Sequence, residues 1–367
     1  MSVKSVIYNI YKRYQHFWPA ATIANYVYTT WKSCGNSLEA PPGSTNYRVA
    51  FICDDMTWQC FSPECQAIFL TPNDWKDALS RFKPDMLFCE SAWTGITERP
   101  DCWRTQIYKN KSIHRNNRKV LFEIVDRCKK EHCPTMFWNK EDPAFFGNTT
   151  YNFVDTALHF DHIFTTAIEC VPLYQNYGHQ SVDLLPFGFS PSIFYPDINI
   201  MKENKAIFAG SWYSDQPQRC KDMQEIFDFV LAQGIELAIY DRQFASPNPV
   251  HRFPSKYEEW IRPAVFYSEL GDIYRRSKYV VNINTVTSSQ SMFARRVYEA
   301  IACDCVVISN HSEGLVQQFS EKIWFPGLHF DKSNCDTIAK ENREEVFARH
   351  TYGQRLKQVL DVAYNDK

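Results

Sequence analysis

Short apolar runs alternate with amphipathic stretches from residue 47 onward. "YRVAFIC" (47–53) and "PDMLFCE" (84–90) have the continuous apolar character of buried strands, whereas "NDWKDALSRFK" (73–83) has helical spacing. Because strands that alternate with helices need crossover connections, the pattern predicts an α/β fold with a mainly parallel sheet. The alternation continues with strands predicted at 134–139, 161–166 and 181–187 and helices at about 112–131 and 168–178.

The same pattern restarts after a polar break with two prolines at 190–204. A second set of strands and helices follows, which predicts two Rossmann-like doubly wound domains that face each other across a cleft. Ligands of such sheets bind beyond the carboxyl ends of the strands. The predicted strands of this half are 205–210, 235–241, 278–284 and 306–308, and the predicted helices are 217–234, 268–277 and a helix from about 291.

These breaks predict four parts of the chain. Residues 1–45 form an aromatic and basic helical extension, and 46–190 form a Rossmann-like acceptor domain. Residues 204–345 form a Rossmann-like domain for a nucleotide-sugar, and 346–367 form a C-terminal helix that packs back on the N-terminal domain.

The N-terminal extension is separated from the first domain by "NSLEAPPGSTN" (36–46), which reads as a linker. Its aromatic residues and lysines allow three placements: in a membrane interface, on its own domain, or on another protein. No window reaches the roughly 18 apolar residues of a membrane span. We therefore expect a cytoplasmic protein with peripheral membrane or protein contact through 1–45.

Composition narrows the class further. The chain has 367 residues, 44% of them hydrophobic and 22% charged, with a net charge of -2, which describes a globular protein and argues against nucleic acid as a partner. Its 13 cysteines form no regular framework, so reduced thiols are expected. Cys128, His132 and Cys133 lack a second half of matching spacing, so no metal site is predicted.

Polar residues follow the predicted strands of the first domain, where a ligand would bind. Carboxylates at these positions are candidates for catalysis, and two tryptophans beside them are candidates for stacking on sugar rings of an acceptor. The alternative interpretation is that the carboxylates cap helices or bridge the aromatic-rich core. The candidate carboxylates are Glu90, Glu141, Asp55 and Asp142, and the tryptophans are Trp93 and Trp138.

A phosphate site is predicted in the second half. Gly210 and Ser211 open a strand-to-helix loop, and Arg219 lies in the first turns of the next helix. Asn284 ends another predicted strand and is assigned to the same donor site. No G-x-G-x-x-G or Walker sequence is present, which argues against a dehydrogenase and a P-loop NTPase.

The stretch "SMFARRVYEAIACDCVVISN" (291–310) adds a charged cluster to this site. Arg295 and Arg296 are predicted to clamp a diphosphate, and Glu299 to accept hydrogen bonds from ribose hydroxyls. The alternative is a surface salt bridge of little consequence.

Several motifs together carry a resemblance over about residues 47–365. They include "PDMLFCESAWTG" (84–95), "FWNKEDP" (137–143), "AIFAGSW" (206–212), "YRRSKYVVNIN" (274–284) and "ARRVYEAIACDCVV" (294–307). With these motifs the chain resembles GT-B glycosyltransferases, most closely the spore-maturation (CgeB-like) group.

The resemblance implies metal-independent transfer of a sugar from a nucleoside-diphosphate sugar to a hydroxyl of a polysaccharide, glycolipid or surface component. It implies that Gly210, Ser211, Arg219 and Arg296 hold the diphosphate and Glu299 the ribose. If the anomeric configuration inverts, a carboxylate of the first domain would deprotonate the acceptor.

The chain departs from this family at two positions. Ser291 stands where many retaining relatives carry the first glutamate of E-x7-E, and Asp304 stands where they carry a glycine. The stereochemical outcome is therefore left open. Two other functions also stay open: transfer from a phosphoribosyl or polyol-phosphate donor, and a non-catalytic nucleotide- or sugar-binding subunit on the same scaffold.

Overall fold

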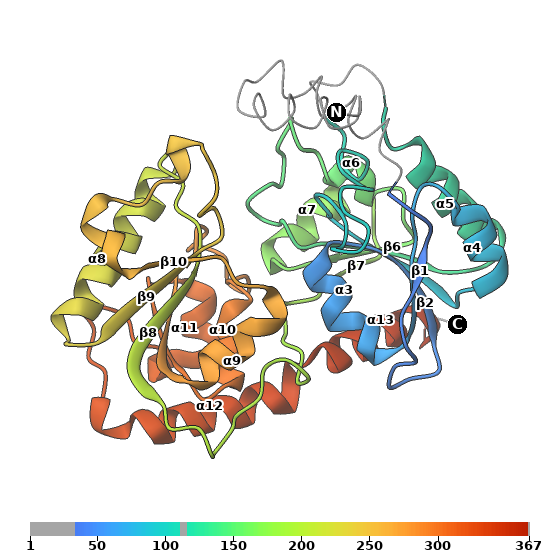
Figure 1. The fold of residues 1–367 in the computed structure, drawn as a ribbon. Helices are drawn as coiled ribbons and strands as arrows, with labels where there is room; N and C mark the ends of the chain where they lie inside the picture. Colours follow the sequence, from blue (N-terminus) through green and yellow to red (C-terminus); the bar gives the residue numbers. More distant parts are fainter. Residues whose placement is uncertain (1–33, 111–115, 366–367) are drawn as a thin grey trace. The chain divides into compact units, whose positions relative to one another are not determined.

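The computed structural model describes residues 34–110 and 116–365, which divide into two compact units (Figure 1). The first unit runs to Pro186 and resumes at Leu356, and the second comprises Phe187–Arg355. Most of the predicted extension 1–45 lies outside the described residues, as do 111–115 near the start of the helix predicted at 112–131.

The first unit is built on a seven-stranded sheet in the order β1-β3-β2-β4-β5-β6-β7. All neighbours pair in parallel except β1, which runs antiparallel to β3. β1 lies inside the segment 36–46 that was predicted to be a linker. β1 and β3 are too short for the apolar pattern to reveal. The strands are β1 Leu38–Glu39, β2 Arg48–Ile52, β3 Gln66–Phe69, β4 Met86–Glu90, β5 Thr135–Asn139, β6 His162–Thr165 and β7 Val182–Leu184.

Helices connect these strands, and the last helix of the chain packs on the same unit. In α13, Gln358 donates a hydrogen bond to the carbonyl of Leu184 (2.7 Å) and Tyr364 donates one to the carbonyl of Asp85 (2.7 Å). Helix α5 begins at Lys119, later than the predicted start near 112. The helices are α3 Asp55–Phe61, α4 Trp75–Phe82, α5 Lys119–Lys130, α6 Val154–Ala157, α7 Val171–Asn176 and α13 Tyr352–Asn365.

The second unit holds a five-stranded parallel sheet in the order β10-β9-β8-β11-β12. Its strands are β8 Glu203–Gly210, β9 Glu236–Asp241, β10 Ile261–Pro263, β11 Ser277–Asn282 and β12 Val306–Ser309. Its helices are α8 Pro217–Ala232, α9 Leu270–Arg275, α10 Arg296–Ala302, α11 Glu313–Phe319 and α12 Cys335–Arg349. Helix α10 begins at Arg296 and not near 291 as predicted. None of the helices in the described ranges combines the length and apolar character needed to cross a membrane.

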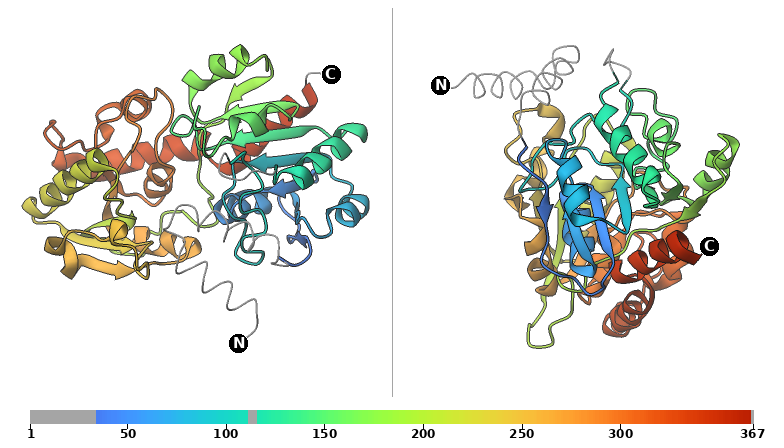
Figure 2. Two further views of the ribbon diagram at one scale, coloured as in Figure 1. Left: turned by 90° about the horizontal axis from the view of Figure 1, so that it is seen from above. Right: turned by 90° about the vertical axis from the view of Figure 1, so that its right-hand side faces the viewer.

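Both faces of the second sheet are covered, as expected for parallel strands (Figures 1 and 2). Successive residues of a strand point to opposite faces. Phe208 and Ile239 therefore lie in one core cluster with Phe227 of α8, while α10 packs on β11 and β12. The carboxyl ends of all five strands meet at one edge of this sheet.

Trp138 of β5 belongs to the core of the first unit. It is 1% exposed, its ring packs against Phe61 and Phe88, and its indole N–H donates to the carbonyl of Leu185 (3.0 Å). The prediction that Trp138 stacks on an acceptor sugar is therefore wrong, because no face of the ring is available.

All thirteen cysteines fall within the described residues, and no disulfide joins them. All except Cys335 are buried. Cys128 and Cys133 lie at the end of α5, and no three His, Cys, Asp or Glu side chains of the described ranges are grouped so that they would hold a metal ion. The chain thus relies on packing and not on covalent cross-links.

We expect Trp138→Ala to lower the free energy of unfolding by about 3–5 kcal/mol, because a large buried ring is lost and the Leu185 carbonyl loses its donor. Urea unfolding checks this value, with Trp138→Phe as the milder control. A loss below about 1 kcal/mol would contradict the assignment of this ring to the core.

Candidate functional site

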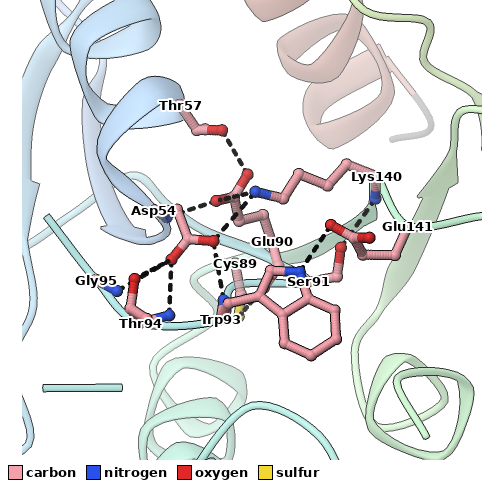
Figure 3. A network of polar contacts seen from close by, with 10 residues as sticks. All are labelled: Asp54, Thr57, Cys89, Glu90, Ser91, Trp93, Thr94, Gly95, Lys140 and Glu141. Carbon is pink, nitrogen blue, oxygen red and sulfur yellow. Dashed lines mark hydrogen bonds and ion pairs between the residues drawn. The ribbon is translucent and has the colours of Figure 1, made fainter. Parts of the chain in front are cut away.

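Three charged side chains meet where β2, β4 and β5 end in the first unit (Figure 3). Asp54 follows β2, Glu90 is the last residue of β4, and Lys140 follows β5. The Lys140 Nζ atom lies 3.2 Å from Asp54 Oδ2 and 3.1 Å from Glu90 Oε1. Because these strands are parallel neighbours, their carboxyl ends bring residues far apart in sequence to one point.

Glu90 is fully buried, and donors surround its carboxylate. Its oxygens accept hydrogen bonds from the Asp54 N–H and the Thr57 hydroxyl as well as from Lys140. Burial raises the pKa of Glu90, against the lowering effect of Lys140. With 0% exposure, this side chain cannot reach an acceptor hydroxyl, so its predicted catalytic role is replaced by a structural one.

Asp54 holds the loop that follows β4. Its carboxylate accepts the backbone N–H groups of Trp93 (2.9 Å), Thr94 (2.8 Å) and Gly95 (3.0 Å). Gly95 has φ +132°, and a Cβ there would lie 2.8 Å from the Arg99 carbonyl oxygen, so glycine is required. Burial works against the charged form of Asp54, but Lys140 and the three N–H groups together lower its pKa.

Lys140 is largely buried, with 11% of its side chain exposed. Burial alone would lower its pKa, but Glu90 and Asp54 more than offset this effect, so that the pKa is raised. Lys140 is therefore charged at neutral pH and bridges the two carboxylates.

Glu141 lies next to this network but remains partly exposed. One of its oxygens accepts a hydrogen bond from the indole N–H of Trp93 (2.9 Å). Burial raises the pKa of Glu141, while Lys140 and the indole N–H lower it. The partly exposed Trp93 ring contacts an aromatic cluster at centroid distances of 5.1–5.4 Å, formed by Tyr108, Phe145, Tyr151 and Phe153.

The other two candidate carboxylates have different surroundings. Asp55 begins α3 and accepts from the Thr97 N–H (2.9 Å) and the Gln59 amide (2.6 Å), so it ties the helix to a neighbouring loop. Asp142 is fully buried. Its carboxylate accepts from Asn139 (2.7 Å), Thr165 (2.7 Å) and Tyr174 (3.0 Å), and burial raises its pKa to about 7. Asp142 is a core group and has no access to an acceptor.

In the second unit, three arginines gather around the carboxyl end of β8. The consecutive carbonyls of Ala209, Gly210 and Ser211 each accept one hydrogen bond. The donors are the Arg296 guanidinium (2.5 Å), the Arg242 backbone N–H (3.1 Å) and the Arg219 guanidinium (2.9 Å), respectively.

The charged forms of two of these arginines, Arg219 and Arg296, are destabilised by their surroundings. Within the described ranges, neither Arg219 nor Arg296 forms an ion pair. Burial and the charge of Arg296 lower the pKa of Arg219 to about 10, and burial also lowers the pKa of Arg296. The Ser211 hydroxyl is buried there and has no hydrogen-bond partner among the described residues. A nearby anion, a polar ligand or water stabilises such groups.

The remaining donor candidates have partners of their own. Arg295 pairs with Glu299 (2.5 Å), and the Tyr267 hydroxyl donates to the same carboxylate (2.7 Å). Glu299 is 1% exposed and 21% of the Arg295 side chain is exposed, so the alternative of a surface salt bridge is wrong: the carboxylate of the pair is buried. Asn284 accepts from the Ala294 N–H (3.0 Å) and so holds the segment before α10.

Three residues of these clusters were not predicted. Asp54 was passed over for its neighbour Asp55, and Lys140 and Arg242 were not considered. Lys140 and Arg242 follow β5 and β9 directly, and only Cys53 separates Asp54 from β2, so the position after an apolar run is the signal that identifies all three.

The fold is shared with solved glycosyltransferases. An alpha-glucosyltransferase in complex with UDP-glucose and DNA containing an abasic site matches with a TM-score of 0.52 and 12% identity, over 87% of this chain and 100% of that chain. HepE of Anabaena in complex with UDP matches with a TM-score of 0.53 and 12% identity, over 86% of this chain and 98% of that one. The predicted α/β fold with two parallel-stranded sheets, of the GT-B type, is confirmed.

A family model adds a match in sequence. Residues 231–361 match the family described as "Glycosyl transferase-like". The comparison with curated proteins gave no match. The family match and the fold agree with the predicted enzyme class, a glycosyltransferase.

The raised pKa of Asp142 predicts a pH-dependent stability. An unfolded aspartate ionises near pH 4, whereas the folded one stays protonated to about 7. Between these values the folded state binds an extra proton, so the free energy of unfolding falls as pH rises from about 4 to about 7. Asp142→Asn should remove this decline, measured by urea unfolding across that range. An unchanged pH slope would contradict the assignment.

Proposed function

We propose that the chain transfers a sugar from a nucleoside-diphosphate sugar, bound by the second unit, to a hydroxyl of a glycan or glycolipid bound by the first unit. The observation that carries this proposal is the set of arginines around the carbonyls of Ala209, Gly210 and Ser211. A guanidinium has five N–H donors, and Arg219 and Arg296 each use one on these carbonyls. The other donors suit the oxygens of a diphosphate.

The comparisons support the same choice of donor. The glucosyltransferase and HepE were solved with UDP-glucose and UDP, respectively, on the same type of fold. The base and sugar of the donor used by this chain remain open, and so does its membership of the spore-maturation (CgeB-like) group. DNA is present in the glucosyltransferase complex, so the absence of nucleic acid among the partners of this chain stays a prediction.

We also propose that transfer is independent of a metal ion, and the same arginines support this. Transfer leaves a diphosphate whose negative charge must be stabilised as the glycosidic bond breaks. We propose that Arg219 and Arg296 supply the positive charge that a divalent cation supplies elsewhere. Burial is the main cause that lowers the pKa values of the two arginines. An anion that binds beside them therefore stabilises their charged forms.

Glu141 is the carboxylate that best fits the acceptor side. Glu90 and Asp142 are fully buried, and Asp55 is held by two donors. Glu141 is partly exposed and accepts one hydrogen bond, from Trp93. A carboxylate with a raised pKa is a stronger proton acceptor than an ordinary one. We assign it the removal of the acceptor proton, with the Trp93 ring as the surface for a sugar.

Arg219→Ala and Arg296→Ala should each weaken binding of a nucleoside diphosphate by about 10- to 100-fold, because one charge-assisted contact contributes about 1.5–3 kcal/mol. Calorimetric titration with a panel of nucleoside diphosphates measures this. Lys221→Ala is the matched control, since Lys221 lies on the same helix but is exposed and pairs with Glu225. Equal affinity in all three variants would contradict the donor site.

Removal of divalent cations should leave turnover of the donor sugar within about twofold, because the arginines already stabilise the leaving group. Release of nucleoside diphosphate with and without EDTA is the measurement. A loss of turnover that Mg²⁺ or Mn²⁺ restores would refute metal independence. Binding without any release would favour the non-catalytic subunit.

A further inference from the structure

Lys140 connects the loops after β4 and β5 through both its backbone and its side chain. Its backbone N–H donates to the Ser91 hydroxyl (3.0 Å), and the Ser91 N–H donates to the carbonyl of Trp138 (3.0 Å). Its ammonium group holds Asp54, which is itself the acceptor for three consecutive N–H groups of the loop after β4. The two loops are therefore fixed to each other (Figure 3).

The chain of contacts ends at Glu141. Trp93 is the first residue whose N–H binds Asp54, and its indole N–H reaches Glu141 Oε1 (2.9 Å). Glu141 also directly follows Lys140 in sequence. Lys140 supplies a cation that acts on Glu141, and through Asp54 it holds the loop that positions the Trp93 indole. Without the cation, Asp54 and Glu90 would be two buried carboxylates without a counter-charge, which is costly.

We propose that Lys140 is a positioning residue for Glu141: through Asp54 it holds the Trp93 loop, and its charge keeps the Glu141 carboxylate ionised and oriented toward the indole. This rests on the role of Glu141 as proton acceptor given above. Lys140 itself is bound by Asp54 and Glu90 and touches no substrate in this account.

The charged groups around Glu141 determine the expected direction. Lys140 and the Trp93 indole favour its ionised form, and Asp54 disfavours it. The charge of Glu141 in turn raises the pKa of Asp142, the next residue. Removal of the Lys140 charge therefore leaves burial and Asp54, which raise the pKa of Glu141, against the indole hydrogen bond alone, and the pKa must rise.

The test is a titration of Glu141 in the full chain by carbon NMR of labelled glutamate carboxyls, with the signal assigned from Glu141→Gln. Lys140→Met should raise the pKa of Glu141 by about one unit or more, because the electrostatic effect of the Lys140 cation is lost. Lys140→Arg should restore the wild-type value. Lys129→Met, which removes an ion pair with Asp161 (3.2 Å) elsewhere in the unit, should leave it unchanged.

Trp93→Phe gives an independent second variant, because it removes the indole donor and leaves every charge in place. It should also raise the pKa of Glu141, since a hydrogen bond to the ionised form is lost. Where Lys140→Met does not fold, Lys140→Gln provides the same comparison. An unmoved titration in folded Lys140 variants would overturn the proposal.

The result is distinguishable from a failure of the proposed function. The titration needs no acceptor and no turnover, so it reports on positioning alone. Unchanged release of nucleoside diphosphate in Glu141→Gln would refute Glu141 as proton acceptor, while a shifted titration in Lys140→Met would still establish that Lys140 controls its charge.

Discussion

Two arginines at the carboxyl end of β8 that form no ion pair within the described ranges are the constraint on which the proposed donor site depends. Arg219 and Arg296 are partly withdrawn from water, and in the described ranges each is held by a backbone carbonyl and not by a carboxylate. Desolvation of an unpaired cation is unfavourable. In the proposed function a diphosphate removes this cost when it binds, so affinity and leaving-group stabilisation have the same origin.

Polar groups at the carboxyl ends of the strands are arranged differently in the two units. In the first unit, Asp54, Glu90 and Lys140 satisfy one another, and the three N–H groups beyond β4 bind a carboxylate of the protein itself. That network is closed and fixes the shape of the loops. In the second unit the Ser211 hydroxyl has no hydrogen-bond partner among the described residues. In the proposed function, the first edge positions side chains and the second binds the donor.

The apolar runs were enough to predict most strands, because buried parallel strands are continuous and hydrophobic. They did not reveal the direction of side chains at strand ends. Trp138 and Lys140 are two residues apart at the end of β5, yet one lies in the core and the other joins the polar network. Asp304 has φ +57°, a conformation that favours glycine. The glycine that the resembled family carries at this position therefore predicts the left-handed backbone. Pairing between distant strand ends, such as Asp54 with Lys140, required the topology.

We expect the diphosphate, and not the base or the sugar, to provide most of the binding energy of the donor. Calorimetric titration of the full chain with the nucleoside diphosphate that binds best and with its parent nucleoside tests this most directly. Two arginines that each contribute about 1.5–3 kcal/mol predict at least about 100-fold tighter binding of the diphosphate. Equal affinities for the two ligands would contradict the account.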